Sequence, residues 1–177
     1  MKHIMDPTIL MDTKQEICSY WLGWMLERSY IEKNKDRIRV SVPIKDIGHL
    51  FLLINDLRSN LIPRKVSRVV NGCNYSGAYL NINSKKLKLF YLDPPILKVD
   101  QRHLLRGMLD GKGVFTKNRG YLRVGYSGKH KQIFIDNFKF NDSFWWTGGE
   151  AIRMVRFLYC NSTRYLKRNV DKVIRFL

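Results

Sequence analysis

Apolar residues recur along this chain with two different periods. In residues 37–42, RIRVSV, every second residue is apolar and the others are basic or polar, which is typical of a strand. In residues 45–61 the apolar positions Ile47, Leu50 and Ile54 have the spacing of one face of a helix. Further strands are expected in residues 65–70 and 77–83, and the final helix at KKLKLFYL, which Asp-Pro-Pro ends. The first half therefore predicts the order helix, strand, strand, helix, strand, strand, helix.

The second half begins in the same way. A helix is expected from about residue 100 to 110, then strands in GVFTKNRG and YLRVGYS, and late helices in GGEAIRMVRFLY and near the end of the chain. This predicts an α+β chain of two repeats, residues 1–95 and 96–177, joined at a Pro-Pro hinge. The second repeat is short, so KQIFIDNF (residues 131–138) is expected to be either a strand that replaces the middle helix or a single surviving helical turn.

Each repeat opens on a helix with a glycine among apolar residues. The two stretches are WLGWMLERS (residues 21–29) and LRGMLDGKG (residues 105–113), with Gly23 and Gly107 at the third place. A residue this small lets two helices pack closely. These motifs and the order of elements resemble the LAGLIDADG homing endonuclease family. The resemblance implies two pseudo-symmetric αββαββα repeats packed through their motif helices, with the second repeat truncated, in a monomeric pseudo-dimer.

The charged residues at the motif ends depart from that family. Its members carry an acid at the eighth motif place of each repeat, and the two acids hold the divalent metals that cut DNA. Here those places are Arg28 and Lys112, which cannot serve as the oxygen ligands that Mg²⁺ needs. Glu27 and Asp110 lie one and two places earlier, rotated by roughly 100° and 200°, and are not expected to converge on a metal. Asp110 is instead expected to pair with Lys or Arg or to bond the following turn.

The charge balance indicates a polyanionic partner. The chain has 32 Lys and Arg against 15 Asp and Glu, a net charge of +17 over 177 residues. Basic groups that neutralise phosphates release counterions, and tyrosines can stack on bases. The expected nucleic-acid-binding residues, taken as basic and aromatic groups on strand faces, are Lys33, Lys35, Arg37, Arg39, Tyr79, Asn81, Lys117, Arg119, Tyr121 and Arg123.

Other features limit the compartment and the cofactors. The three cysteines are far apart and without metal-ligand spacing, which favours a reducing compartment and no zinc site. No apolar run approaches the ~20 residues of a membrane span, and the first residues lack a signal-peptide pattern. We expect an organelle matrix, mitochondrial for an organelle-encoded chain, with the cytoplasm as the alternative. No cofactor is expected, and Mg²⁺ enters only if the chain is an endonuclease.

These observations favour a non-catalytic nucleic-acid-binding protein on a nuclease scaffold. The partner is expected to be RNA rather than DNA, in a ribonucleoprotein that also contains neighbouring proteins. An organellar ribosome component and an intron-splicing maturase both fit. The main alternative is an active LAGLIDADG DNA endonuclease. A second alternative is a small RNA-recognition module, which RGYLRVGY (residues 119–126) partly matches, or a regulatory DNA-binding module.

Overall fold

The first half of the molecule has the predicted order of elements. The computed structural model describes residues 4–138 and 145–177. The short 3-10 helix η1 (Pro7–Leu10) precedes the first motif helix. The helices and strands that follow are α1 (Glu16–Arg28), β1 (Ser29–Glu32), β2 (Arg37–Pro43), α2 (Ile47–Asp56), β3 (Arg64–Val70), β4 (Cys73–Asn83) and α3 (Lys85–Leu92), with η2 (Ile44–Asp46) leading into α2. The predicted αββαββα order of the first repeat is confirmed.

The second half repeats this order in a shortened form. After η3 (Ile96–Lys98) come α4 (Gln101–Lys112), β5 (Gly113–Asn118), β6 (Tyr121–Tyr126), α5 (Lys131–Phe138), β7 (Trp145–Thr147), α6 (Gly148–Tyr159), α7 (Lys167–Val173) and η4 (Ile174–Phe176). Neither expectation for residues 131–138 is right. They form a helix of eight residues, because this helix buries Phe134, whose ring centroid lies 4.2 Å from that of Tyr126 with the two rings tilted by 30°.

Two antiparallel sheets carry the strands. The first has the order β1-β2-β4-β3, and the second, in the described residues, has the order β5-β6-β7. In the first sheet Ile38 pairs with Ile82 and Val40 with Leu80, and all four are buried. Helices α1 and α2 pack against this inner face. Because side chains alternate along a strand, the opposite outer face is left with the polar residues.

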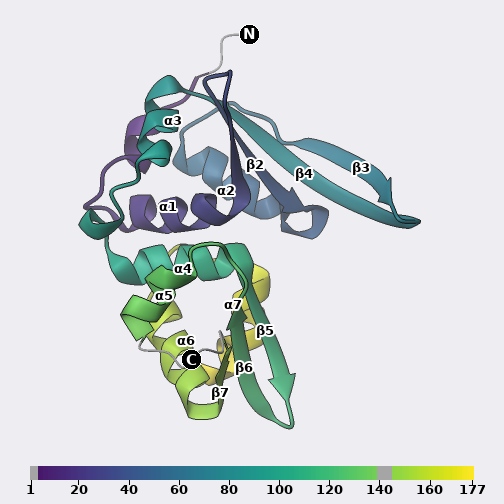
Figure 1. Cartoon of the computed structure of the whole chain (residues 1–177), viewed down its shortest axis with the longest axis vertical. Helices are drawn as coiled ribbons and strands as arrows, with labels where there is room; N and C mark the ends of the chain where they lie inside the picture. Colours follow the sequence, from purple (N-terminus) through teal and green to yellow (C-terminus); the bar gives the residue numbers. More distant parts are fainter. Residues whose placement is uncertain (1–3, 139–144) are drawn as a thin grey trace.

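Helices α1 and α4 lie side by side at the centre of the molecule, with the first repeat on one side and the second on the other (Figure 1). Their glycines make the contact between backbones. A Cβ atom at Gly107 would lie 2.8 Å from the amide nitrogen of Trp24 and against the carbonyl oxygen of Tyr20. One at Gly23 would lie 2.9 Å from the carbonyl carbon of Leu104. Any side chain at either position would therefore push the two helices apart.

A buried polar chain crosses this contact. His49 on α2 lies 2.8 Å from the hydroxyl of Tyr20 on α1, which in turn donates to Asp110 on α4 at 2.9 Å. Burial lowers the pKa of His49 to about 3, against the opposing effect of Asp56. The imidazole is therefore neutral near pH 7 and forms a hydrogen bond with the Tyr20 hydroxyl, which itself links the two repeats through Asp110.

Among residues 4–138 and 145–177, no helix has both the length and the apolar composition that a membrane span requires.

The glycine contact leads to a prediction on stability. Gly23→Ala and Gly107→Ala should each lower the free energy of unfolding by about 2–3 kcal/mol, because the added methyl meets backbone that cannot move aside. Gly48→Ala is the matched control in helix α2, where a Cβ would meet no atom of residues 4–138 or 145–177 within 4 Å. It should leave stability unchanged or raise it by up to ~1 kcal/mol. Urea unfolding measures all three, and equal values for Gly107→Ala and Gly48→Ala would contradict the close contact.

The buried histidine leads to a prediction on pH. The unfolded chain takes up a proton at this residue near pH 6.5, whereas the folded chain does so only near pH 3. Stability from this group is thus complete above pH 6.5 and is lost as the pH falls toward 3, by at most ~1.4 kcal/mol per pH unit. His49→Gln keeps an N–H for Tyr20 but cannot titrate. Between pH 7 and pH 5 the parent should lose about 2 kcal/mol more than the variant in urea unfolding, and an equal loss would exclude a neutral buried His49.

Candidate nucleic-acid interface

The eighth motif places carry two cations in different surroundings. Arg28, the last residue of α1, is half-buried, and its pKa is lowered by burial and by the nearby charge of Arg168. Arg168 itself pairs with Asp46 at 2.7 Å. Lys112 ends α4 and is exposed, and its carbonyl oxygen accepts hydrogen bonds from Ser127. The ends of the two motif helices therefore present positive charge.

Glu27 points into the second repeat. It is buried, and its carboxylate accepts a 2.6 Å hydrogen bond from the Tyr126 hydroxyl. The amide of Lys129 lies 3.4 Å from its other oxygen. A Cβ atom at Gly111 would lie 2.7 Å from the Cβ of Glu27, so the small residue on α4 makes room for this side chain. Glu27 serves here to join the end of α1 to the second sheet.

The carboxylate of Asp110 is buried and fully hydrogen-bonded. Each of its oxygens accepts two hydrogen bonds, all of 2.6–2.9 Å. Burial raises its pKa, and these hydrogen bonds oppose the rise. The expectation that Asp110 would pair with Lys or Arg or bond the following turn is wrong. Its donors are the hydroxyls of Tyr20 and Tyr159, the amide nitrogen of Leu166 and the side-chain amide of Asn169.

This arrangement does not fit a catalytic Mg²⁺. The metal needs several oxygen ligands that converge on one point. Here a guanidinium and an ammonium group occupy the places of the acids, and the two neighbouring carboxylates bind different parts of the second repeat. In the part of the chain that the structure describes, no group of three or more His, Cys, Asp or Glu side chains is arranged to hold a metal ion.

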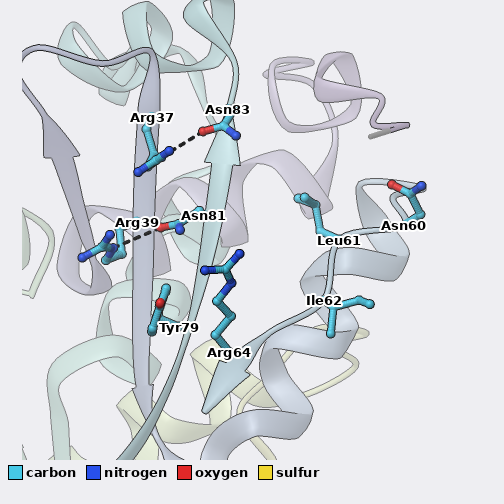
Figure 2. A pocket seen from close by; sticks show the side chains of 9 residues that line it. All are labelled: Arg37, Arg39, Asn60, Leu61, Ile62, Arg64, Tyr79, Asn81 and Asn83. Atoms are coloured by element: carbon cyan, nitrogen blue, oxygen red, sulfur yellow. Dashed lines mark hydrogen bonds between the residues drawn. The ribbon is translucent and has the colours of Figure 1, made fainter. Parts of the chain in front are cut away.

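The outer face of the first sheet gathers arginine, asparagine and tyrosine. Arg37 and Arg39 on β2 donate through Nε to the side-chain oxygens of Asn83 and Asn81 on β4, each at 3.0 Å (Figure 2). The Arg39 guanidinium also lies 4.9 Å from the ring centroid of Tyr79. The two strands thus hold both guanidinium groups in place on the solvent side, and four residues expected to bind nucleic acid lie on one face.

Lys33 and Lys35 are not on this strand face. The alternation that places Arg37 and Arg39 stops at residue 37, because residues 33–36 form the turn between β1 and β2. The ammonium group of Lys88 on α3 donates to the carbonyl oxygens of both turn lysines, which ties the turn to that helix. The prediction that Lys33 and Lys35 lie on the strand is therefore wrong, and both residues lie in the turn at the end of the sheet.

One acid lies among these cations. The carboxylate of Glu32 on β1 is 3.5 Å from Arg37, 3.3 Å from Arg39 and 3.7 Å from Lys35. Since one carboxylate cannot neutralise three cations, the cluster keeps a net positive charge.

Strands β3 and β4 extend this face beyond the body of the molecule (Figure 1). Residues 64–69 and 71–76 are exposed on both faces of this hairpin. By register, Arg64 pairs with Tyr79 and Arg68 with Tyr75, so both arginines join the outer face. Sequence reasoning missed these residues and Asn83. The alternating stretch RKVSR could have indicated the arginines, but their position opposite the tyrosines requires the register.

The four nucleic-acid-binding residues predicted in the second sheet do not lie on one face. Tyr121 and Arg123 lie on its outer face, where Arg123 stacks at 4.2 Å on Trp145, a residue that sequence reasoning missed. Lys117 pairs with the buried Leu122 and so lies on the inner-face side. Arg119 lies in the turn between β5 and β6. The expectation that all four lie on strand faces is therefore wrong for Arg119, and Lys117 faces away from the other two.

Comparison with solved structures identifies the fold. The chain is similar to the N-terminal LAGLIDADG domain of DUF199/WhiA, at 13% identity and a TM-score of 0.52, with 97% of this chain and 93% of that chain covered. It is also similar to full-length DUF199/WhiA from Thermatoga maritima, at 12% identity and a TM-score of 0.52, with 91% of this chain covered. The match spans 59% of that full-length protein. The predicted LAGLIDADG-like α+β fold is confirmed.

At the level of sequence, neither the models of known protein families nor the curated proteins give a match.

The structural role of Asp110 can be tested by one substitution. One of its oxygens accepts a 2.6 Å hydrogen bond from the backbone N–H of Leu166, and the other accepts a 2.9 Å hydrogen bond from the side-chain NH₂ of Asn169. In Asp110→Asn, whichever oxygen becomes NH₂ faces an N–H donor, so we expect a loss of about 2–4 kcal/mol in urea unfolding. Asp136→Asn, on the exposed side of α5, is the control and should change stability by less than ~0.5 kcal/mol. Equal effects would show that the buried carboxylate is dispensable.

Proposed function

We propose that this chain binds nucleic acid on the outer faces of its two sheets and does not cleave it. The observation that carries the proposal is the outer face of the first sheet. There, Arg37, Arg39, Arg64 and Arg68 alternate across strands with tyrosine and asparagine, on a chain of net charge +17. Guanidinium groups bind phosphate oxygens, while amides and aromatic rings contact bases and sugars.

The residues at the C-terminal ends of α1 and α4 support the proposal that the chain does not cleave nucleic acid. Strand cleavage on such a scaffold would need carboxylates at the tips of α1 and α4 to hold metal ions. Arg28 and Lys112 stand there, and Glu27 and Asp110 are held in buried hydrogen bonds. The positive tips suit contact with a phosphate backbone better than binding of a second cation.

Within this proposal, structured RNA is the preferred partner. Sequence-specific RNA binding uses unpaired bases that stack on aromatic rings. The outer faces offer such rings in exposed positions, at Tyr30, Tyr75, Tyr121 and Trp145. We extend the proposal to a role in a ribonucleoprotein, as a component of an organellar ribosome or as an intron-splicing factor, because a small, strongly basic and non-catalytic chain suits either assembly.

A pair of matched double variants tests the binding face. Arg37→Gln with Arg39→Gln removes two charges from the outer face, whereas Lys85→Gln with Lys86→Gln removes two exposed charges from helix α3. Filter binding of a hairpin RNA at several salt concentrations measures both. The arginine pair should lower affinity about tenfold or more and reduce the salt slope by about 2, and the lysine pair should change each much less.

Equal losses in the two double variants would contradict a localised interface. A second arm incubates the parent protein with plasmid DNA and with the hairpin RNA in Mg²⁺. Intact substrates are expected, and cleavage of either would overturn the non-catalytic half of the proposal.

A further inference from the structure

A pocket of about 520 Å³ opens at the edge of the first sheet, between β4 and the segment that leads into β3. It exists because β3 begins only at Arg64, opposite Tyr79, while β4 continues to Asn83. Residues 80–83 therefore have β2 on one side and the pocket on the other. We name this the β4-edge pocket. Its lining residues are Arg37, Arg39, Asn60, Leu61, Ile62, Arg64, Tyr79, Asn81 and Asn83 (Figure 2).

The polar wall of the pocket consists largely of donors. Asn81 and Asn83 use their side-chain oxygens to accept from the two β2 arginines, which leaves each NH₂ group as a donor. Among the described residues, three arginines and no acid line the pocket, so this lining carries a net positive charge. A ligand that fits this wall must be negatively charged and rich in acceptors.

Arg64 differs from the other two arginines. Arg37 and Arg39 are each held by an asparagine and approached by Glu32. The Arg64 side chain is exposed, and within the described residues its guanidinium forms no hydrogen bond or ion pair. Its five N–H donors can thus receive a phosphate without breaking an existing ion pair.

The opposite wall is apolar. Ile62 is 80% exposed and Leu61 is partly exposed, and both lie on the segment that faces the arginine and asparagine side chains. In Figure 2 the Arg64 side chain lies between Asn81 and these two residues. An anion alone would leave this apolar wall uncovered, whereas a nucleotide has both a phosphate for Arg64 and a flat base to cover Leu61 and Ile62.

We propose that the β4-edge pocket binds one unpaired nucleotide of the bound nucleic acid, with its phosphate on Arg64 and its base against Leu61 and Ile62. This inference rests on the proposed function and adds that the bound nucleotide is unpaired. The volume suits a small group rather than a double helix. A paired base would first have to be extruded at a cost of a few kcal/mol, so the pocket selects loops, bulges and strand ends.

The experiment compares two RNAs of equal length and charge, a blunt duplex and the same duplex with an internal bulge of unpaired nucleotides. The parent should prefer the bulged RNA by about tenfold in filter binding. Arg64→Gln should reduce binding of the bulged RNA about tenfold and that of the duplex much less. Arg68→Gln removes the same charge from the same strand outside the pocket and should weaken both RNAs equally.

A second pair of variants tests the apolar wall without changing charge. Ile62→Ser should reduce binding of the bulged RNA about fivefold and leave duplex binding unchanged. Val69→Ser is the control, because Val69 is similarly exposed on β3, pairs with Asn74 on the face opposite the arginines and does not line the pocket. It should leave binding of both RNAs unchanged. Both residues are exposed, so neither substitution should affect folding.

The outcomes separate this inference from the function on which it rests. If the parent binds both RNAs equally and Arg64→Gln behaves like Arg68→Gln, nucleic-acid binding stands and the nucleotide pocket is wrong. If the parent binds neither RNA more tightly than heparin, a sugar-based polyanion, the proposed function itself fails. A loss of bulge preference confined to Arg64→Gln and Ile62→Ser is the result that supports the pocket.

Discussion

The backbone contact between α1 and α4 is the constraint on which the remaining structure depends. Gly23 and Gly107 bring the main chains of the two helices together, so the distance between the repeats is set by backbone atoms rather than by side chains that can change rotamer. Each helix leads directly into the first strand of its own sheet, at Ser29 and at Gly113. The relative position of the two sheets, and thus of their outer faces, follows from this one contact.

Buried acids then fix the remaining elements around the helix pair. A carboxylate in the interior is costly unless several donors satisfy it. Asp110 meets that condition with four donors, two of them from residues 166–169, which lead into and begin α7. The carboxylate of Asp56 on α2 accepts a hydrogen bond from the Trp21 indole N–H. It also accepts two hydrogen bonds from Nε and Nη2 of Arg164, each at 2.7 Å. The end of the second repeat is thereby tied to the first, and each oxygen of Asp110 already accepts two hydrogen bonds.

The parts of this structure that depend on local pattern could be predicted, and those that depend on pairing between distant residues could not. Alternation in RIRVSV predicted the inner and outer sides of β2, and the run KKLKLFYL, ended by Asp-Pro-Pro, predicted α3 to the residue. The β4-edge pocket could not be predicted, because it depends on β3 starting opposite Tyr79, a matter of register. Lys117 lies two residues after the buried Phe115, so the alternation along β5 itself places Lys117 on the inner-face side. The partners of Asp110 lie 49 to 90 residues away in the sequence, beyond any local pattern.

The arrangement of the outer-face arginines bears on how selective the binding can be. Asn81 and Asn83 hold Arg39 and Arg37 before any ligand arrives, so less side-chain entropy is lost when a phosphate binds. Glu32 works in the opposite direction, since a phosphate must compete with a carboxylate already beside both groups. That competition weakens binding to any polyanion and so penalises non-specific contact. In the part of the chain that the structure describes, no carboxylate competes for Arg64, so a ligand that reaches the β4-edge pocket gains a contact that Arg37 and Arg39 offer only against Glu32.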